Sequence, residues 1–258
     1  MKPTVPDKAI LHKFGYHSNQ EGIALRYVRE DDNWVSHLAN TKRFIISSVR
    51  KIRPHVVTIL GSGWLLDVPV QELLMHTSRV RLVDIVHPPD ILKKYEGISA
   101  VEIVVDDISG GLIALTWDMA ESKIKPTFEQ IISSLELLEY KPIDEQGMVI
   151  SVNILSQLPS LPFEFLVKKK LITDDQYPVF AAKVQEKHLA FLKKNKGVLI
   201  TDYEEVHTDR KGLNTKELPV YCKLPAGQKR EEWTWQFDTN GSYKQGNNTA
   251  MRVVAIHI

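Results

Sequence analysis

The sequence holds a single cysteine, no surplus of charge and no long apolar run, and each shortage excludes a class of protein. Cys222 has no second cysteine with which to form an internal disulfide, as is typical of a reducing cytoplasm. The 33 Lys and Arg residues almost balance the 32 Asp and Glu residues, which argues against a broad nucleic-acid-binding surface. No stretch approaches about 18 apolar residues in succession, so no membrane span is predicted. We therefore expect a cytoplasmic protein.

Signals for secretion and for metal binding are missing as well. Residues 1–10 contain two prolines and no apolar centre, so no signal peptide is expected. The nine histidines show no His-x3-His spacing and no paired cysteines accompany them, so no metal site is predicted. What remains is a chain of 258 residues, 43% of them hydrophobic, which is enough for one sizeable α/β core.

Short apolar segments alternate with helix-like segments along most of the chain. Strands are predicted at 56–60, 80–84, 101–105, 148–152 and 197–202. Helices are predicted at 67–76, 89–95, 109–120, 126–139 and 178–194, after a helical pattern that runs from Asn33 to Pro54. This alternation favours parallel strands joined by crossover helices.

The two ends of the chain have different patterns. Residues 1–32 are polar and mixed, and we interpret them as a loose lead-in or a short cap. Residues 233–237 alternate between apolar and polar, and residues 251–258 form a last apolar run, which predicts an antiparallel pair joined by a longer loop. The fold prediction is therefore one Rossmann-like α/β domain over residues 33–258. Its sheet is mostly parallel and ends in an antiparallel hairpin strand.

The most informative segment is Leu60-Gly61-Ser62-Gly63, at the end of the first predicted strand. Glycines at 61 and 63 let the backbone approach a ligand where a Cβ would collide, just before a helix with free N–H groups. Asp84 ends the second predicted strand, roughly 20 residues further on, where nucleotide-binding domains place an acid on the ribose. The pair indicates a cofactor of the adenosine type.

The order of strands and helices resembles the class I S-adenosylmethionine-dependent methyltransferase family. That resemblance implies a three-layer sandwich with a seven-stranded sheet, the last strand being inserted antiparallel. It also implies that S-adenosylmethionine is the cofactor, with Gly61, Ser62 and Gly63 on its methionine part and Asp84 on its ribose. The acceptor of the methyl group is expected to be a small molecule or another soluble compound, with no nucleic acid or membrane partner evident.

Other site residues are implied by their places after the later strands. Asp106 or Asp107, with the apolar Ile108, follows the third strand, where the family places residues near the adenine. Asn153 follows the fourth strand, where the methyl group meets its acceptor. The resemblance identifies no catalytic residue. The candidates for contact with the acceptor, after the fourth and fifth strands, are Ser156, Asp202 and Tyr203, with His207 a weaker one.

Several of these residues, and some others, are also compatible with purely structural roles. Asp107 is equally suited to cap the helix that follows it, and Tyr16 and His17 are candidates for a lid over the site. We interpret His188 as a surface or packing residue. Trp233 and Trp235, two residues apart on one face of a strand, are most simply core residues.

Departures from the family pattern keep two other functions in view. The family commonly has an acid two residues before the first glycine and a third glycine, and here Ile59 and Leu65 occupy those places. One alternative is therefore a fold relative that binds the cofactor, or nothing, and serves as an interaction module. A nicotinamide-dependent oxidoreductase is the other, although its G-x-G-x-x-G motif would need glycine where Leu66 stands.

Overall fold

A computed structural model describes residues 6–142 and 145–258. Over these ranges the chain forms an eight-stranded sheet with the order β3-β2-β1-β4-β5-β8-β7, and β6 pairs with β5 alone. The strands are β1 (Val56–Leu60), β2 (Arg79–Asp84), β3 (Val101–Val105), β4 (Met148–Val152), β5 (Val198–Thr208), β6 (Asn214–Glu217), β7 (Arg230–Asp238) and β8 (Asn248–His257).

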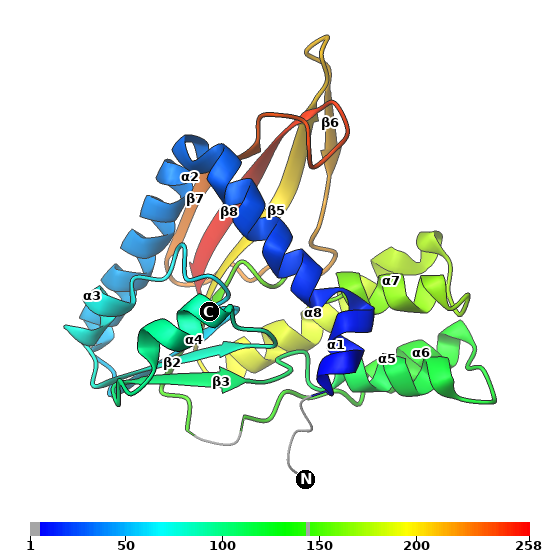
Figure 1. The fold of residues 1–258 in the computed structure, drawn as a ribbon, viewed down its shortest axis with the longest axis horizontal. Coiled ribbons are helices and arrows are strands. Elements are labelled where there is room, and N and C mark those ends of the chain that lie inside the picture. Colours follow the sequence, from blue (N-terminus) through cyan, green and yellow to red (C-terminus); the bar gives the residue numbers. More distant parts are fainter. Residues whose placement is uncertain (1–5, 143–144) are drawn as a thin grey trace.

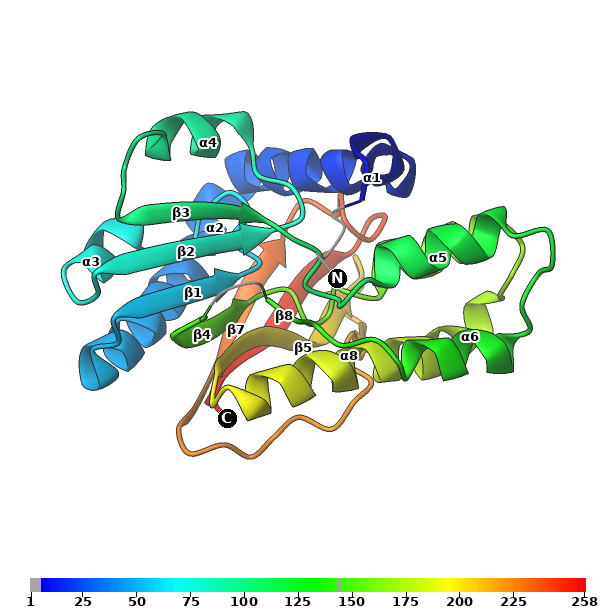
Figure 2. The same ribbon diagram turned by 90° about the horizontal axis from the view of Figure 1, so that it is seen from below.

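The first five strands are parallel, and β8 lies antiparallel between β5 and β7 (Figure 2). This inserted antiparallel strand is the arrangement that the class I methyltransferase fold implies, so the predicted fold class is confirmed. The count of seven strands is wrong by one. Strand β6 was missed because its sequence, Asn-Thr-Lys-Glu, is exposed throughout and carries no apolar alternation.

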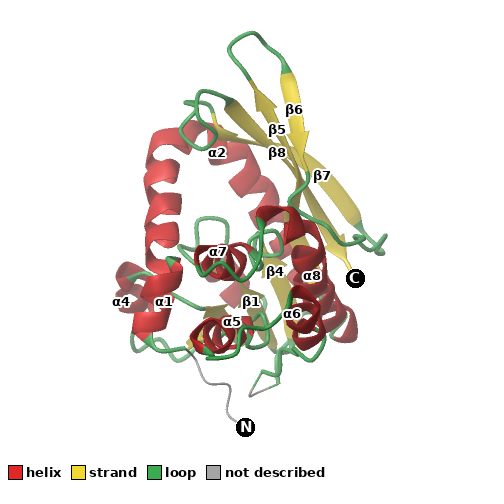
Figure 3. Cartoon of the chain, turned by 90° about the vertical axis from the view of Figure 1, so that its right-hand side faces the viewer, coloured by secondary structure: helices red, strands yellow, loops and turns green. Residues whose placement is uncertain are grey.

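Helices cover both faces of the sheet, giving the expected three layers (Figures 1 and 3). The largest hydrophobic cluster packs α2 residues such as Phe44 and Ile45 against the sheet, and a second packs residues such as Leu112 and Phe180 against its opposite face. A third, smaller cluster joins α1 to α5 and α7. The helices are α1 (Lys8–Phe14), α2 (Tyr16–Ile52), α3 (Val70–Leu74), α4 (Pro89–Tyr95), α5 (Leu112–Glu121), α6 (Phe128–Leu135), α7 (Ser160–Lys168) and α8 (Tyr177–Lys194).

Residues 6–32 are not a loose lead-in. They form α1 and the first half of α2, a helix of 37 residues that runs through the expected boundary at Asn33. Glu30 interrupts α2 with a non-helical backbone (φ −119°, ψ 18°), and Figure 1 shows the resulting bend near the end of β7. The first half of α2 therefore crosses in front of the sheet, while the second half packs on it.

Two further elements differ from expectation, each for a local reason. Helix α7 was not predicted, because Pro159 and Pro162 resemble loop residues, yet proline is tolerated in a first helical turn. Strand β5 continues past Asp202 to Thr208, because β8 on one side and β6 on the other pair with its outer half. Among the described residues, no helix is long and apolar enough to cross a membrane.

Candidate functional site

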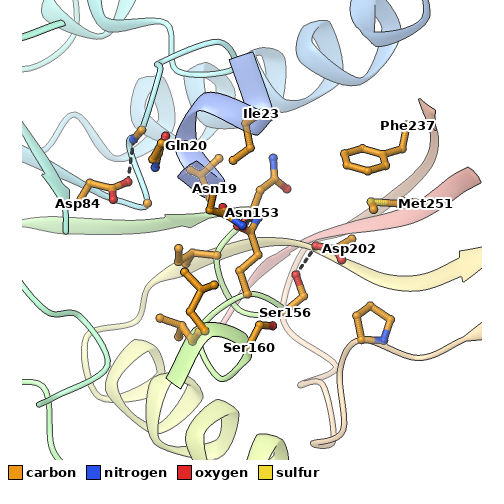
Figure 4. Close-up of a pocket in the computed structure, with 18 of the residues that line it drawn as sticks. Asn19, Gln20, Ile23, Asp84, Asn153, Ser156, Ser160, Asp202, Phe237 and Met251 are labelled. Atoms are coloured by element: carbon orange, nitrogen blue, oxygen red, sulfur yellow. Dashed lines mark hydrogen bonds between the residues drawn. The ribbon is translucent and has the colours of Figure 1, made fainter. Parts of the chain in front are cut away.

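A cavity of about 670 Å³ opens at the carboxyl ends of β1, β2, β4 and β5. This edge is where open α/β sheets bind ligands. Figure 4 shows Asp84 at one end of the cavity and Phe237 and Met251 at the other, with α2 residues above. The predicted site residues that line it are Gly61, Ser62, Gly63, Asp84, Asp107, Ile108, Asn153, Ser156 and Asp202.

The turn after β1 is shaped by contact with β4. Gly61 has φ +81°, and a Cβ there would lie 2.8 Å from the carbonyl oxygen of Val152 and 2.9 Å from Cβ of Ile154. A side chain at 61 would therefore collide with the protein itself. Gly63, with φ +42°, has more room, since the nearest atoms to its Cβ position belong to Gln20, at 3.5 Å.

Asp84 is buried and tied to the glycine turn. Its Oδ2 accepts a hydrogen bond from the Gly63 N–H at 2.8 Å, while its Oδ1 has a long contact of 3.4 Å to the Val86 N–H. Burial raises the pKa of Asp84, while His87 and the Gly63 N–H oppose that rise. The carboxylate thus holds the turn through one oxygen and keeps acceptor capacity on the other.

The first half of α2 roofs the cavity from the Asp84 end, where Gln20 lies beside Gly63, to the far end, where Arg26 lies over Phe237. Tyr16, Asn19, Gln20, Ile23 and Arg26 recur at helical spacing and line the cavity together. The carbonyl oxygen of Gln20 accepts from the Trp64 indole N–H at 2.8 Å, which fastens α2 to the segment after the turn. Burial, with Asp107 and Asp84 nearby, raises the pKa of Tyr16 well above its usual value, so the hydroxyl stays a donor.

Of the two acids after β3, only Asp107 lines the cavity. Its Oδ1 accepts from the Ser109 N–H at 3.0 Å and its Oδ2 from the Ile113 N–H at 3.3 Å, so it also holds the start of α5. Asp106 lies outside the lining and accepts a hydrogen bond from the Tyr140 hydroxyl at 3.1 Å. The structure therefore places Asp106 apart from the other predicted site residues, because adjacent residues point to opposite sides.

Asn153 stands at the centre of the cavity in a left-handed conformation, φ +49°. Its side-chain amide donates to Asp67 Oδ2 at 2.7 Å and lies 3.3 Å from Nε2 of His37. Neither Asp67 nor His37 was predicted from the sequence, and both line the cavity. Burial lowers the pKa of His37 to about 3, so its ring is neutral.

Ser156 and Asp202 form a pair on the wall between β4 and β5. The Ser156 hydroxyl donates to Asp202 Oδ1 at 2.7 Å, and burial raises the pKa of Asp202. Tyr203 points away from this wall, and its hydroxyl donates to Glu232 Oε2 at 2.9 Å. Its expected contact with the acceptor is therefore not supported by the geometry, since successive strand residues face opposite sides of the sheet.

The residues at the far end of the cavity were not predicted from the sequence. Glu205 on β5 and Glu217 on β6 line it, together with Tyr243 and Lys244 from the loop between β7 and β8. The Tyr243 hydroxyl donates to Glu205 Oε1 at 3.2 Å, and burial raises the pKa of Glu205 to about 7. The predicted strand ended at residue 202, whereas β5 continues to Thr208 and carries Glu205 to this end of the cavity.

An aromatic wall completes this far end. Trp235 and Phe237 of β7 are edge to face, with ring centroids 4.8 Å apart, and both rings pack on Trp34. The Arg26 guanidinium lies 4.8 Å from the Phe237 ring centroid and 5.1 Å from that of Tyr243. Trp235 is a core residue, as predicted, and its inner face also borders the cavity.

No protein-family model matches the sequence, and no curated protein matches it. Solved structures with a similar course of the chain include a complex of DhpI with SAH, at 12% identity and a TM-score of 0.36, covering 92% of this chain and 95% of that one. A methyltransferase domain of bacterial CtHen1 is 10% identical with a TM-score of 0.35, covering 84% and 99%.

The SAH-bound methyltransferase PaMTH1 from Podospora anserina is 11% identical with a TM-score of 0.27, covering 76% of this chain and 83% of its own. Identities and TM-scores of this size do not assign a function.

Proposed function

We propose that this chain is an S-adenosylmethionine-dependent methyltransferase that acts on a small-molecule or other soluble acceptor. One observation carries the proposal. The Gly61–Gly63 turn is hydrogen-bonded to the buried Asp84 at the end of a cavity that continues past Asn153 to Ser156 and Asp202. The inserted antiparallel strand β8 supports the same assignment.

The residues at the Asp84 end fit an adenosyl cofactor. Asp84 would take the ribose hydroxyls through the oxygen that Gly63 leaves free, since both hydroxyls are donors and a carboxylate is an acceptor. The backbone of residues 61–63 would hold the methionine part, and Ile108 would supply an apolar contact to the adenine. The cofactor supplies the methyl group.

The chain's own contribution is to position the acceptor. Transfer of a methyl group from a sulfonium is an in-line displacement, and holding the reacting atoms about 3–3.5 Å apart supplies much of the rate gain. Ser156 and Asp202 face the cavity beyond Asn153, so they are placed to orient an acceptor. A general base is needed only if the acceptor must lose a proton.

Ligand titration separates this proposal from its two alternatives. Binding of S-adenosylhomocysteine to the folded protein should raise its melting temperature, and NAD should leave it unchanged. A shift with NAD alone would favour an oxidoreductase. No shift with either would favour an interaction module, and binding without turnover on a panel of amine, hydroxyl and thiol acceptors would favour a fold relative that has lost catalysis.

A variant of Asp84 tests the site itself. The change Asp84→Ala should weaken S-adenosylhomocysteine binding by about 1.5–3 kcal/mol, or roughly 10- to 150-fold, because a charge-assisted hydrogen bond to the ribose is lost. Asp106→Asn is a matched control, since Asp106 directly follows the neighbouring strand β3 and lies outside the cavity lining. Isothermal titration calorimetry should give unchanged affinity for that control. Equal affinity in both variants would remove Asp84 from the binding site.

A further inference from the structure

Three potential metal ligands meet where β5 and β6 pair, at the far end of the cavity. Glu205 and Glu217 are direct partners across the two antiparallel strands, and His207 lies two residues along β5 on the same face. Like charges placed directly opposite each other destabilise a sheet unless a cation lies between them. Lys244 forms an ion pair with Glu217, and Glu205 has no ammonium or guanidinium partner of its own among the ion pairs of the described residues.

One donor atom from each side chain points to a common centre. Nε2 of His207 lies 3.3 Å from Oε2 of Glu205 and 3.8 Å from Oε2 of Glu217. All three atoms lie within 4.8 Å of one another. Donors bound about 2.1 Å from one ion are about 3.0–3.4 Å apart at octahedral and tetrahedral angles. The side chains of Glu217 and of its ion-pair partner Lys244 are 52% and 45% exposed, so both have room to move the remaining distance together.

The other polar atom of each ligand is already held by a neighbour. The Tyr243 hydroxyl donates to Oε1 of Glu205 at 3.2 Å, and Lys244 donates to Oε1 of Glu217. Nδ1 of His207 lies 3.0 Å from the Thr249 hydroxyl. When Nδ1–H donates to Thr249, the lone pair of Nε2 is turned toward the two carboxylates. Outer contacts of this kind orient metal ligands in proteins.

His207 supplies an independent sign of a ligand. Its side chain is 0% exposed, yet its Nε2 has no hydrogen-bond partner among the described residues. A buried ring nitrogen without a partner costs free energy, and a metal ion is a partner that a neutral imidazole readily accepts.

We propose that Glu205, His207 and Glu217 bind a divalent first-row transition-metal ion, of which Zn²⁺ is the representative. One imidazole nitrogen with two carboxylates suits Zn²⁺ or Mn²⁺ better than Ca²⁺ or Mg²⁺, which prefer oxygen ligands alone. Glu205 and Glu217 line the cavity, so the remaining coordination positions face its interior. An oxygen donor of a molecule bound there would reach the ion.

This site could not be predicted from the sequence, because its three ligands follow no metal-binding spacing. Glu205 and His207 are separated by one residue, and Glu217 follows ten residues later, beyond the hairpin turn. Only the pairing of β5 with β6 brings them together. The site is independent of the proposed methyl transfer, since no cofactor is needed to form it.

Direct metal titration tests the site without any assay of activity. Protein treated with EDTA and then freed of the chelator is titrated with Zn²⁺ by calorimetry, and with Co²⁺ by visible absorption. We expect one equivalent to bind to the wild-type chain, with Co²⁺ bands of a nitrogen- and oxygen-ligated ion. His207→Gln and Glu217→Gln should each abolish this binding or weaken it at least 100-fold.

Two more variants sharpen the result. Thr249→Val removes the partner of Nδ1 and should weaken binding about 10- to 100-fold, as loss of an outer contact does. Glu204→Gln is the control, because Glu204 neighbours Glu205 but pairs with Lys216 outside the cluster, and it should bind as the wild type does.

The proposal is overturned if the wild-type chain binds neither ion. Unchanged stoichiometry and affinity in the His207 and Glu217 variants would also overturn it, since the ion would then lie elsewhere. If His207→Gln does not fold, Glu217→Gln decides, because the residue lies in a fully exposed strand.

Discussion

The two ends of the cavity are built on different principles. At the end near Asp84, short parallel strands stop and the backbone turns, and the Gly61–Gly63 turn brings main-chain atoms to the surface of the cavity. At the end near Glu205, long antiparallel strands and the first half of α2 contribute side chains, which hydrogen bonds hold in place. We call these the glycine end and the hairpin end.

The difference predicts how each end fails. Adding atoms to a backbone turn that is packed against a neighbouring strand should lower stability strongly, because overpacking forces the surrounding structure to shift. A wall of hydrogen-bonded side chains should be more sensitive to the loss of a polar group, because its hydrogen-bond partners are then left buried and unsatisfied. The predictions below compare the two ends, from the largest expected effect to the smallest.

The largest effect is expected from an added methyl group at the glycine end. Gly61 and Gly212 have nearly equal φ angles, +81° and +80°, yet nothing lies within 4 Å of a Cβ at Gly212, in the β5–β6 turn. Gly61→Ala should lower the free energy of unfolding by about 3–4 kcal/mol, because a strained backbone and a collision add. Gly212→Ala should cost about 1 kcal/mol, from strain alone. Urea unfolding of both variants measures the difference, and equal losses would contradict the packing argument.

The second largest loss of stability is expected from replacing Glu30, whose hydrogen bonds hold α2 over the hairpin end. Glu30, 1% exposed, accepts hydrogen bonds from the Thr239 N–H at 3.0 Å and hydroxyl at 2.9 Å, and from Asn33 at 2.9 Å. Asn240 donates to it as well. Glu30→Ala should lower the free energy of unfolding by about 2–3 kcal/mol, since buried donors lose a charged acceptor.

The neighbouring residue provides a control for Glu30. Asp31 is exposed, and Asp31→Ala should change the free energy of unfolding by less than about 0.5 kcal/mol. The first half of α2 should also become more accessible in the Glu30 variant, which faster amide hydrogen exchange over residues 16–29 would report. Unchanged exchange there would mean that α2 is held in place by its other contacts.

A pH series compares two buried histidines on helices α2 and α8, which cover opposite faces of the sheet. His188 packs beneath β4, with Nε2 2.8 Å from the Ser151 hydroxyl, and burial lowers its pKa to about 4. Burial lowers the pKa of His37 to about 3. Below pH 6.5 the unfolded chain takes up protons that the folded chain does not, so stability is full above that pH and falls toward the folded pKa.

Each histidine should remove about 2 kcal/mol of stability between pH 7.5 and pH 5.0. Asp67, Asp107 and Asp202 act in the opposite direction, because burial raises their pKa values and stability then increases as the pH falls. The measurement is therefore a difference between chains. Wild type should lose about 2 kcal/mol more than His188→Gln over this interval in urea titrations. Parallel pH profiles would show that His188 keeps an ordinary pKa.

The same contrast explains which parts of the molecule the sequence revealed. The glycine end was predicted because each of its residues lies within a few positions of a strand end that apolar runs mark, as with Gly61 and Asp84. Local patterns suffice there, since parallel strands all end at one edge of the sheet.

The hairpin end and its roof were missed for physical reasons. The face of α2 that carries Asn19, Gln20 and Arg26 borders a cavity instead of a core, so it has no apolar stripe to detect. Strand β6 is exposed along its whole length and shows no alternation. His188, expected on the surface or in packing, proved to be fully packed, because a polar partner on β4 lets a histidine replace an apolar residue in a helix.

The smallest effect concerns the ring of His37, which is buried beside Trp233 and Asn153. The Trp233 indole N–H donates to Nδ1 of His37 at 3.1 Å, and beyond His37 the amide of Asn153 donates to Asp67 at 2.7 Å. Because an indole only donates, Nδ1 must accept, and the single ring proton of His37 stays on Nε2. The 3.3 Å contact between Nε2 and the donating amide nitrogen of Asn153 is therefore not a hydrogen bond. Trp233→Phe should lower the free energy of unfolding by about 1 kcal/mol. It should also raise the pKa of His37, since Nδ1 is then free to take a proton, and an NMR titration of the His37 ring would detect this. If the pKa does not rise, burial alone keeps the ring neutral.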